Sequence, residues 1–169
     1  GNPFSFSAWS KITASQLTAD CSPGLVQLGG RPASLDLFSW GLCREYVHSG
    51  PSMYLRGVTS DGATYTNVDL TGITFNDDAW HFYGFSRSAA GVVRVYFDDQ
   101  MAEGSGTLTP QALSAATTTY FGLGGLDQQA ASSSRGHRGN IDEAYFWTRE
   151  LTPAEFTHLY NAGTGNYLA

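Results

Sequence analysis

Short runs in which apolar and polar residues alternate cover nearly the whole chain, and clusters of Gly, Pro, Asp, Asn and Ser separate them. This combination is typical of the strands of a β-sandwich. In residues 92–98, for example, Val93, Val95 and Phe97 fall on one side of an extended chain and Arg94 falls on the other. The pattern predicts strands at Phe4–Lys11, Leu25–Gly29, Ser34–Leu42, Met53–Thr59, Thr64–Leu70, Trp80–Arg87, Val92–Asp98, Thr118–Leu123 and Asn140–Thr148.

The predicted strand Trp80–Arg87 is partly apolar on both faces, as expected of a central strand that is covered on both sides. Its two faces carry Trp80, Phe82 and Gly84, and His81, Tyr83 and Phe85. Large aromatic side chains in a sandwich are more often core than surface. We therefore expect Trp9, Trp80 and Trp147 in the core, and Trp40, Tyr46 and Tyr120 as candidates for exposed rings.

One short helix is predicted near the C-terminal end of the sequence. Thr152 can cap it, Pro153 suits the first helical position, and Glu155 completes a Thr-x-x-Glu capping box. Gly163 supplies the expected stop. The helix would pack on the sandwich through the apolar side chains of Phe156, Leu159 and Tyr160.

Composition supports a single all-β domain over residues 1–169. Apolar residues make up 41% of the chain, aromatic residues 14% and charged residues only 14%, which suits a β-sandwich interior and argues against disorder. A chain of 169 residues fits one domain and is long enough to bury a core without a metal or disulfide. We expect a two-sheet antiparallel jelly-roll sandwich with one short C-terminal helix.

Charge excludes two classes of partner. The net charge is −6, and the 9 basic residues are scattered along the chain, whereas nucleic-acid binding needs a clustered basic stripe. The same scatter weighs against binding to anionic membrane surfaces. No apolar run approaches the roughly 18 residues of a membrane span. The first residues, Gly1–Phe4, have no basic flank or apolar stretch of a signal peptide, so we expect a chain that is processed or cut from something longer.

Four segments together resemble the laminin G-like and pentraxin-related jelly-roll family, which has the concanavalin A-like fold. Their order across residues 4–161 is specific for this fold, but the fold hosts unrelated activities. The segments are Phe4-Ser-Phe-Ser-Ala-Trp-Ser-Lys11, Trp80-His-Phe-Tyr-Gly-Phe85, Gly91-Val-Val-Arg-Val-Tyr-Phe-Asp98, and Gly139-Asn-Ile-Asp-Glu-Ala-Tyr145 followed by Arg149–Glu155 and Leu159-Tyr160.

The chain departs from the family at its start and at one turn. Family members carry a strand before the segment that matches Phe4–Lys11, so we expect Phe4–Lys11 to form a sheet edge that a partner chain, the tail Thr164–Ala169 or an upstream segment must complete. Asp98-Asp99 stands where the family usually has Asp-Gly, so we expect a hairpin turn of different shape.

Catalytic constellations are absent from the sequence, and we expect no enzyme activity. The glucanases of this architecture resemble one another in a Glu-x-Asp-x-Glu strand, which the chain lacks, and regular strand geometry would point the neighbours Asp142 and Glu143 to opposite faces. The four histidines lie far apart, and no serine occupies a Gly-x-Ser-x-Gly turn. His81 is expected to be a half-buried strand residue.

The loop Gly124–Arg138 is the expected ligand-binding segment, because it is the most polar irregular stretch and lies at the family's usual working end. The candidate ligand-binding residues are Asp127, Gln128, Arg135 and His137. The pentraxin resemblance implies a calcium site that uses Asp127, with Gln128 and Asp142 as weaker ligands. Arg135 falls at a later ligand position of that pattern and disfavours a cation. The sequence leaves calcium open and implies no other cofactor.

The two cysteines, Cys21 and Cys43, bracket the predicted hairpin Leu25–Leu42 and would lie at the same end of it. A disulfide between them and two reduced, buried thiols are both consistent with the sequence.

These observations favour a non-catalytic recognition or adhesion module outside a cell, whose rim loops bind a glycan or protein surface. The alternative is a structural decoration, spike or fibre domain of a virion or another large assembly, in which the chain would form a homo-oligomer.

Overall fold

The computed structural model describes residues 3–13, 24–28, 41–47, 53–60, 65–105, 121–123, 137 and 139–166. Ten strands and one α-helix lie within these ranges. The strands are β1 (Phe4–Thr13), β2 (Gly24–Leu28), β3 (Gly41–Val47), β4 (Met53–Ser60), β5 (Tyr65–Thr71), β6 (Asp77–Arg87), β7 (Val92–Phe97), β8 (Gln100–Ser105), β9 (Phe121–Leu123) and β10 (Asn140–Trp147); the helix α1 (Pro153–Tyr160) precedes a short 3₁₀ turn, η2 (Asn161–Gly163).

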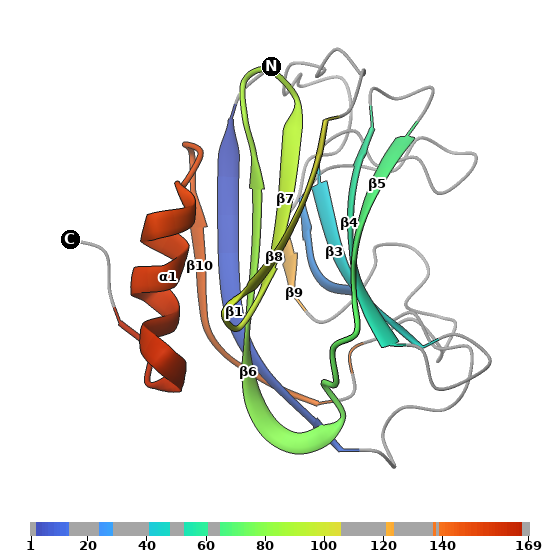
Figure 1. The fold of residues 1–169 in the computed structure, drawn as a ribbon, viewed down its shortest axis with the longest axis vertical. Helices are drawn as coiled ribbons and strands as arrows, with labels where there is room; N and C mark the ends of the chain where they lie inside the picture. The colour runs from blue at the N-terminus through green and yellow to red at the C-terminus, as the bar shows by residue number, and fades with distance from the viewer. Residues whose placement is uncertain are drawn as a thin grey trace.

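The strands form two antiparallel five-stranded sheets. We call them sheet I, with the order β10-β1-β6-β7-β8, and sheet II, with the order β5-β4-β3-β2-β9. The two sheets face each other, and α1 lies on the side of sheet I that is turned away from sheet II (Figure 1). The predicted fold class, a jelly-roll sandwich with one short C-terminal helix, is confirmed.

The first strand is not a sheet edge, and that expectation is wrong. β1 pairs with β6 on one side and with β10 on the other. The closing strand of the family pattern therefore satisfies the backbone groups of Phe4–Lys11 from within the chain. In the described residues the edges of sheet I are β10 and β8.

The space between the sheets holds the larger of two apolar clusters. Phe4 and Phe6 both stack on Phe85, with the ring centroids of Phe6 and Phe85 4.9 Å apart. Gly57 of sheet II makes room for this packing, because a Cβ there would lie 2.4 Å from a methyl carbon of Val95. Aromatic residues of sheet I thus supply much of the inter-sheet core.

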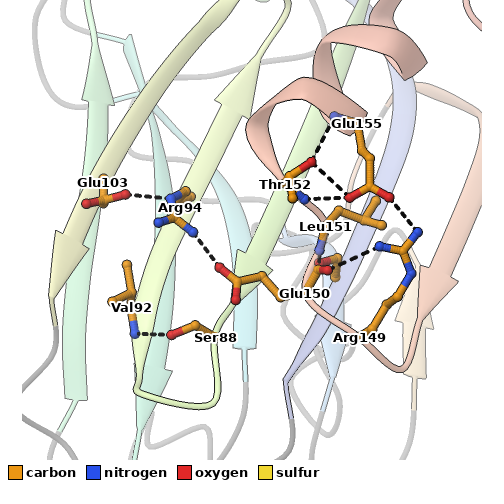
Figure 2. Close-up of polar contacts among 10 residues, drawn as sticks. Ser88, Val92, Arg94, Glu103, Arg149, Glu150, Leu151, Thr152 and Glu155 are labelled. Carbon is orange, nitrogen blue, oxygen red and sulfur yellow. Dashed lines mark hydrogen bonds and ion pairs between the residues drawn. The ribbon is translucent and has the colours of Figure 1, made fainter.

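The predicted capping box begins α1. The Thr152 side chain accepts a hydrogen bond from the Glu155 amide, and Glu155 accepts one from the Thr152 amide, as Figure 2 shows. An ion pair with Arg149, together with the hydrogen bond from the Thr152 backbone, lowers the pKa of Glu155 to about 2. Beside this cap Arg94 of β7 pairs with Glu150 and with Glu103, which ties the helix entrance to sheet I.

The outer face of sheet I receives the helix. Phe156 stacks on Tyr96 with a centroid distance of 3.8 Å, and it packs over Gly84, where a Cβ would lie 2.5 Å from the ring. The amide of Leu151 donates to the buried Ser5 hydroxyl. The strand containing Phe82 and Gly84 is therefore covered on both faces, as its sequence predicted. The second apolar cluster consists of Trp9, Phe82, Tyr96, Leu151, Phe156 and Leu159.

Three local features differ from the sequence prediction. Strand β8 (Gln100–Ser105) was not predicted, because its alternation is weak and it directly follows the Asp98-Asp99 turn. Strand β3 begins at Gly41, so it shares only two residues with the predicted strand Ser34–Leu42, whose first part lies outside the described residues. The helix ends earlier than expected, because Asn161 takes the left-handed capping conformation that Gly163 was expected to supply.

Candidate functional site

The chain turns sharply where α1 ends and forms one wall of a hollow. Asn161, Ala162, Gly163 and Gly165 all have positive φ angles. The Asn161 amide side chain donates to the Thr164 hydroxyl (2.8 Å) and to the Gly165 carbonyl (3.0 Å). The Gly165 amide in turn donates to the carbonyl of Tyr160. This network holds residues 163–165 in place at the end of the helix.

The floor of the hollow comes from two tryptophans on the outer face of sheet I. Trp9 of β1 is 9% exposed and lies between Phe82 and Tyr160 under the end of the helix. Trp80 of β6 lies just beyond the reach of the helix and is 44% exposed. The expectation that Trp80 belongs to the core is therefore wrong. The helix covers the outer face only as far as the row of Phe82 and Trp9, and Trp80 lies in the next row.

A bulge in β10 brings two carboxylates to the same hollow. Ser7 pairs with Tyr145 and Trp9 with Asp142, so that one residue of β1 faces two residues of β10. Glu143 takes a left-handed conformation with φ of 47° at this point. A bulge breaks strict alternation, so the expectation that Asp142 and Glu143 point to opposite faces is wrong. Their arrangement is fixed by a hydrogen bond of 2.8 Å from the Glu143 amide to the Asp142 carboxylate.

These elements enclose a hollow of about 240 Å³, which we call the Trp80 hollow. A Cβ at Gly165 would lie 3.5 Å from the Glu143 carboxylate and 3.7 Å from the Trp9 indole nitrogen, so the wall and the floor are in close contact. An exposed indole thus stands beside two carboxylates in a concave surface. The lining residues are Trp9, Trp80, Asp142, Glu143, Gly163, Thr164 and Gly165.

Among the residues that the structure describes, Lys11 is a cation that the strand register places beside the hollow, because it lies directly opposite Trp80 on β6 and opposite Asn140 on β10. Its ammonium group is 3.1 Å from the carboxylate of Asp78. The positive charge of Lys11 is therefore matched by Asp78.

A second polar cluster lies around His81, on the opposite face of β6 from Trp80. The two ring nitrogens of His81 contact Asp98 (2.7 Å) and Asp77 (3.0 Å). Asp98 also accepts a hydrogen bond from the Phe82 amide and has a φ of 52°, so this side chain fixes the β7–β8 turn. His81 is half-buried as predicted, and its contacts give it a structural role in the turn.

The residues predicted as ligands from the sequence do not all come together. Asp142 lines the Trp80 hollow, whereas His137 lies 3.1 Å from the hydroxyl of Ser10, whose side chain belongs to the opposite face of β1. The candidates Asp127, Gln128 and Arg135 lie outside the described residues, as does Cys21, and of Cys43 the structure describes only its place in β3. Within the described ranges, no three His, Cys, Asp or Glu side chains are grouped so that they could hold a metal ion.

Sequence and structure comparisons give the family. The model of the concanavalin A-like lectin/glucanases superfamily, laminin G type, matches residues 1–156. The chain belongs to this superfamily. No curated protein matches the chain. The four segments of the sequence that resemble the laminin G-like family therefore lie in a domain of that family. In the described residues no helix has the length and apolar character needed to cross a bilayer.

Solved structures share the fold of this laminin G-like domain at low identity. A heptameric SAP-like pentraxin from Limulus polyphemus superposes with a TM-score of 0.65 and 11% identity, over 94% of this chain and 70% of the pentraxin chain. A Ruminococcus gnavus sialidase module, CBM40, bound to α2,3-sialyllactose superposes with a TM-score of 0.63 and 10% identity, over 92% of this chain and 81% of the module. Trypanosoma rangeli sialidase in complex with sialic acid superposes with a TM-score of 0.66 and 16% identity over 94% of this chain. The chain spans only 23% of the sialidase.

The hollow was missed by the sequence analysis for two physical reasons. A bulge in the middle of a regular strand leaves no periodicity signal, so the sequence did not indicate that Asp142 and Glu143 line the same hollow. The exposure of Trp80 depends on where a helix far away in sequence ends. One available signal was the run Asn76-Asp77-Asp78, which only Ala79 separates from Trp80, because three polar residues at the start of a strand indicate a solvent-exposed end.

Proposed function

We propose that the chain is a non-catalytic glycan-recognition module that acts outside a cell and binds its ligand in the Trp80 hollow. Residues 1–169 form one such module in this proposal. The family and the fold support glycan binding in general. The proposed binding site is the Trp80 hollow, whereas the sequence favoured the loop Gly124–Arg138.

The observation that carries the proposal is the exposed indole of Trp80 beside the carboxylates of Asp142 and Glu143. A sugar ring has an apolar face, which stacks on an indole, and hydroxyl groups, which donate hydrogen bonds to carboxylates. Ligand sites in general combine an apolar surface with a small number of polar groups that fix orientation. The hollow has both parts, and the turn at residues 163–165 holds one of its walls in place.

Binding to a glycan array, followed by calorimetric titration of the best ligand, tests the proposal. Trp80→Ala should weaken binding by at least about tenfold, the size expected when a central aromatic contact is removed. Met101→Ala is the matched control, because Met101 is also 44% exposed but lies on the edge strand β8. Equal affinities of the Trp80→Ala and wild-type proteins would overturn the assignment of the hollow.

The second candidate function is a structural role in a virion or another large assembly. The observation that favours it is the edge of sheet I, where β8 carries the exposed Met101. An edge strand presents backbone groups to which another chain can pair. Sedimentation velocity separates the two functions. A symmetric oligomer that dissociates on Met101→Lys, in a protein that binds no glycan, would support assembly over recognition.

A further inference from the structure

We propose that Asp77, His81 and Asp98 form a pH-sensitive brace that positions Trp80, so that the Trp80 hollow binds its glycan more tightly when His81 is protonated. We call these three residues the His81 brace. The inference rests on the proposed function and adds a means of regulation to the same site. Asp77 and His81 are positioning residues here, because they act on the ligand only through Trp80.

Trp80 lies in a short segment at the start of β6 that polar contacts hold on both sides of it. The carboxylate of Asp77 accepts a hydrogen bond from the Ala79 amide (3.1 Å) and lies 3.0 Å from Nε2 of His81. Asp77 thus contacts both sequence neighbours of Trp80. Asp78 has a φ of 65°, a left-handed conformation that is unfavourable for a residue other than glycine. Because Trp80 is 44% exposed, the place of its ring depends on this anchored backbone more than on packing.

The two polar contacts of His81 require a charged imidazole. Nδ1 lies 2.7 Å from the carboxylate of Asp98, and Nε2 lies 3.0 Å from the carboxylate of Asp77. A carboxylate only accepts hydrogen bonds, so each ring nitrogen must carry a proton to bond to one. A neutral imidazole has a single N–H. Both hydrogen bonds therefore form together only when His81 is protonated.

Asp77 is the partner that a neutral His81 gives up. The side chain of Asp98 is 19% exposed, makes the shorter contact and is also held by the Phe82 amide (2.9 Å). The side chain of Asp77 is 44% exposed, so water can replace His81 there. After deprotonation a lone pair on Nε2 faces the Asp77 carboxylate, and the two groups repel each other. The start of β6 then loses an anchor, and Trp80 shifts with it.

The protonation state of His81 sets the direction of the pH effect. Burial lowers its pKa, but the hydrogen bonds to Asp98 and Asp77 hold the pKa above the ordinary value of 6.5. The brace is therefore complete below pH 6.5 and opens as pH rises through the pKa of folded His81. Glycan binding in the hollow should weaken over the same interval.

A second histidine lies near the brace, and its effect must be separated from that of His81. Ser10 of β1 lies opposite His81, and its hydroxyl is 3.1 Å from Nε2 of His137. Carboxylate, ammonium and phenol groups in ordinary surroundings titrate outside the interval from pH 5.5 to pH 8, which leaves histidine as the competing type of group. The other titratable groups that the structure describes beside the brace are Asp78, Lys11, Asp99 and Tyr160.

The experiment compares binding at pH 5.5 and pH 8. The glycan array is probed at both values, and only neutral glycans are compared, because their own charge does not change. For the wild-type protein we expect the affinity for neutral glycans to fall by about two- to fivefold from pH 5.5 to pH 8, the effect of losing a partly exposed charged contact.

A second measurement follows Trp80 without a ligand. The protein is labelled with 5-fluorotryptophan, and Trp80→Phe assigns the Trp80 signal in the fluorine NMR spectrum. The difference in chemical shift between H2O and D2O reports the exposure of the indole. We expect this difference to change with pH, with a midpoint above pH 6.5, in the wild type and to stay constant in His81→Asn.

Three variants assign the change in binding. His81→Asn removes the titrating ring and should bind equally at both pH values, with the affinity of the wild type at pH 8. Asp77→Asn offers an amide N–H to the lone pair of neutral His81 and still accepts from Ala79, so its binding should stay tight at pH 8. His137→Asn is the matched control and should lose affinity with rising pH as the wild type does.

The outcomes separate this inference from the proposed function. Equal binding by the wild type at both pH values overturns the inference while glycan recognition stands. A loss of affinity that persists in His81→Asn or in Asp77→Asn, or that disappears in His137→Asn, overturns it as well. If no glycan binds at either pH, the proposed function is wrong. The fluorine signal still tests the brace in that case, and a wild-type signal that does not respond to pH overturns the positioning of Trp80 by His81.

Discussion

His81 shows how a single side chain couples the stability of the sandwich to pH. Burial lowers the pKa of His81, but its hydrogen bonds to Asp98 and Asp77 outweigh this effect, so that the pKa lies above the ordinary value of 6.5. The hydrogen bond to His81 also holds the pKa of Asp77 below its ordinary value, although burial acts in the opposite direction. The charged imidazole thus ties the start of β6 to the β7–β8 turn.

The first prediction follows from this shift. A group whose pKa is higher in the folded than in the unfolded state stabilises the protein fully below its unfolded pKa and loses this contribution as pH rises through the folded pKa. The difference in free energy of unfolding between wild type and His81→Asn should therefore be largest below pH 6.5 and decrease at higher pH. Urea unfolding at several pH values measures it.

His158→Asn is the control for this series, since His158 is exposed on α1 and distant in sequence from the β7–β8 turn. A difference for His81→Asn that stays constant or grows with rising pH would contradict the expected role of Asp77 and Asp98.

At the scale of elements, the strands and the helix follow from the sequence wherever a local signal specifies them. The Thr152–Glu155 capping box was predicted because both partners lie within one helical turn, and β6 was predicted because its apolar residues fall on both faces. The Trp80 hollow could not be predicted, because it depends on a register shift between β1 and β10 and on the point where α1 stops covering sheet I. Both are set by packing between segments that are distant in sequence.

Helix α1 is docked on sheet I through Phe156, which packs against Gly84, and a second prediction tests this contact. Gly84→Ala places a methyl group where Phe156 lies, and overpacking of this kind typically costs about 1–3 kcal/mol. The cost should appear as a lower urea midpoint with an unchanged slope. In the double mutant Gly84→Ala/Phe156→Leu the added methyl group should cost less than in the wild-type background, because the ring that it meets has been removed.

Strict additivity of the two substitutions would contradict the contact between Gly84 and Phe156. Ala79→Gly offers a comparison at the exposed start of the same strand, where the methyl group is not buried and the expected cost is the backbone entropy of glycine, about 0.5–1 kcal/mol.

At the scale of the whole molecule, the superfamily is named for both lectins and glucanases, and the surroundings of the hollow's carboxylates bear on the proposed non-catalytic role. A retaining glycosidase needs two carboxyl groups about 5–5.5 Å apart on either side of the scissile bond, and one of them must stay protonated through desolvation. Asp142 is exposed and Glu143 is only half-buried beside it in an open hollow. The partial or full exposure of both carboxylates supports the proposed non-catalytic role.

The third prediction concerns turnover. Incubation of the protein with common polysaccharides should release no reducing ends, and Asp142→Asn should leave this result unchanged while it weakens the binding of the glycan selected on the array. Measurable hydrolysis that disappears in Asp142→Asn would contradict the non-catalytic role and would identify Asp142 as a catalytic residue.

The Trp80 hollow draws its walls from β1, β6, β10 and residues 163–165. Within this domain Trp9 is therefore synthesised long before Gly165, and most of both sheets and the whole helix lie between them in the sequence. No nascent or truncated product that lacks the final turn can present the complete surface. Under the proposed function, an immobilised ligand should therefore retain molecules whose whole domain has been made and folded, and let fragments pass.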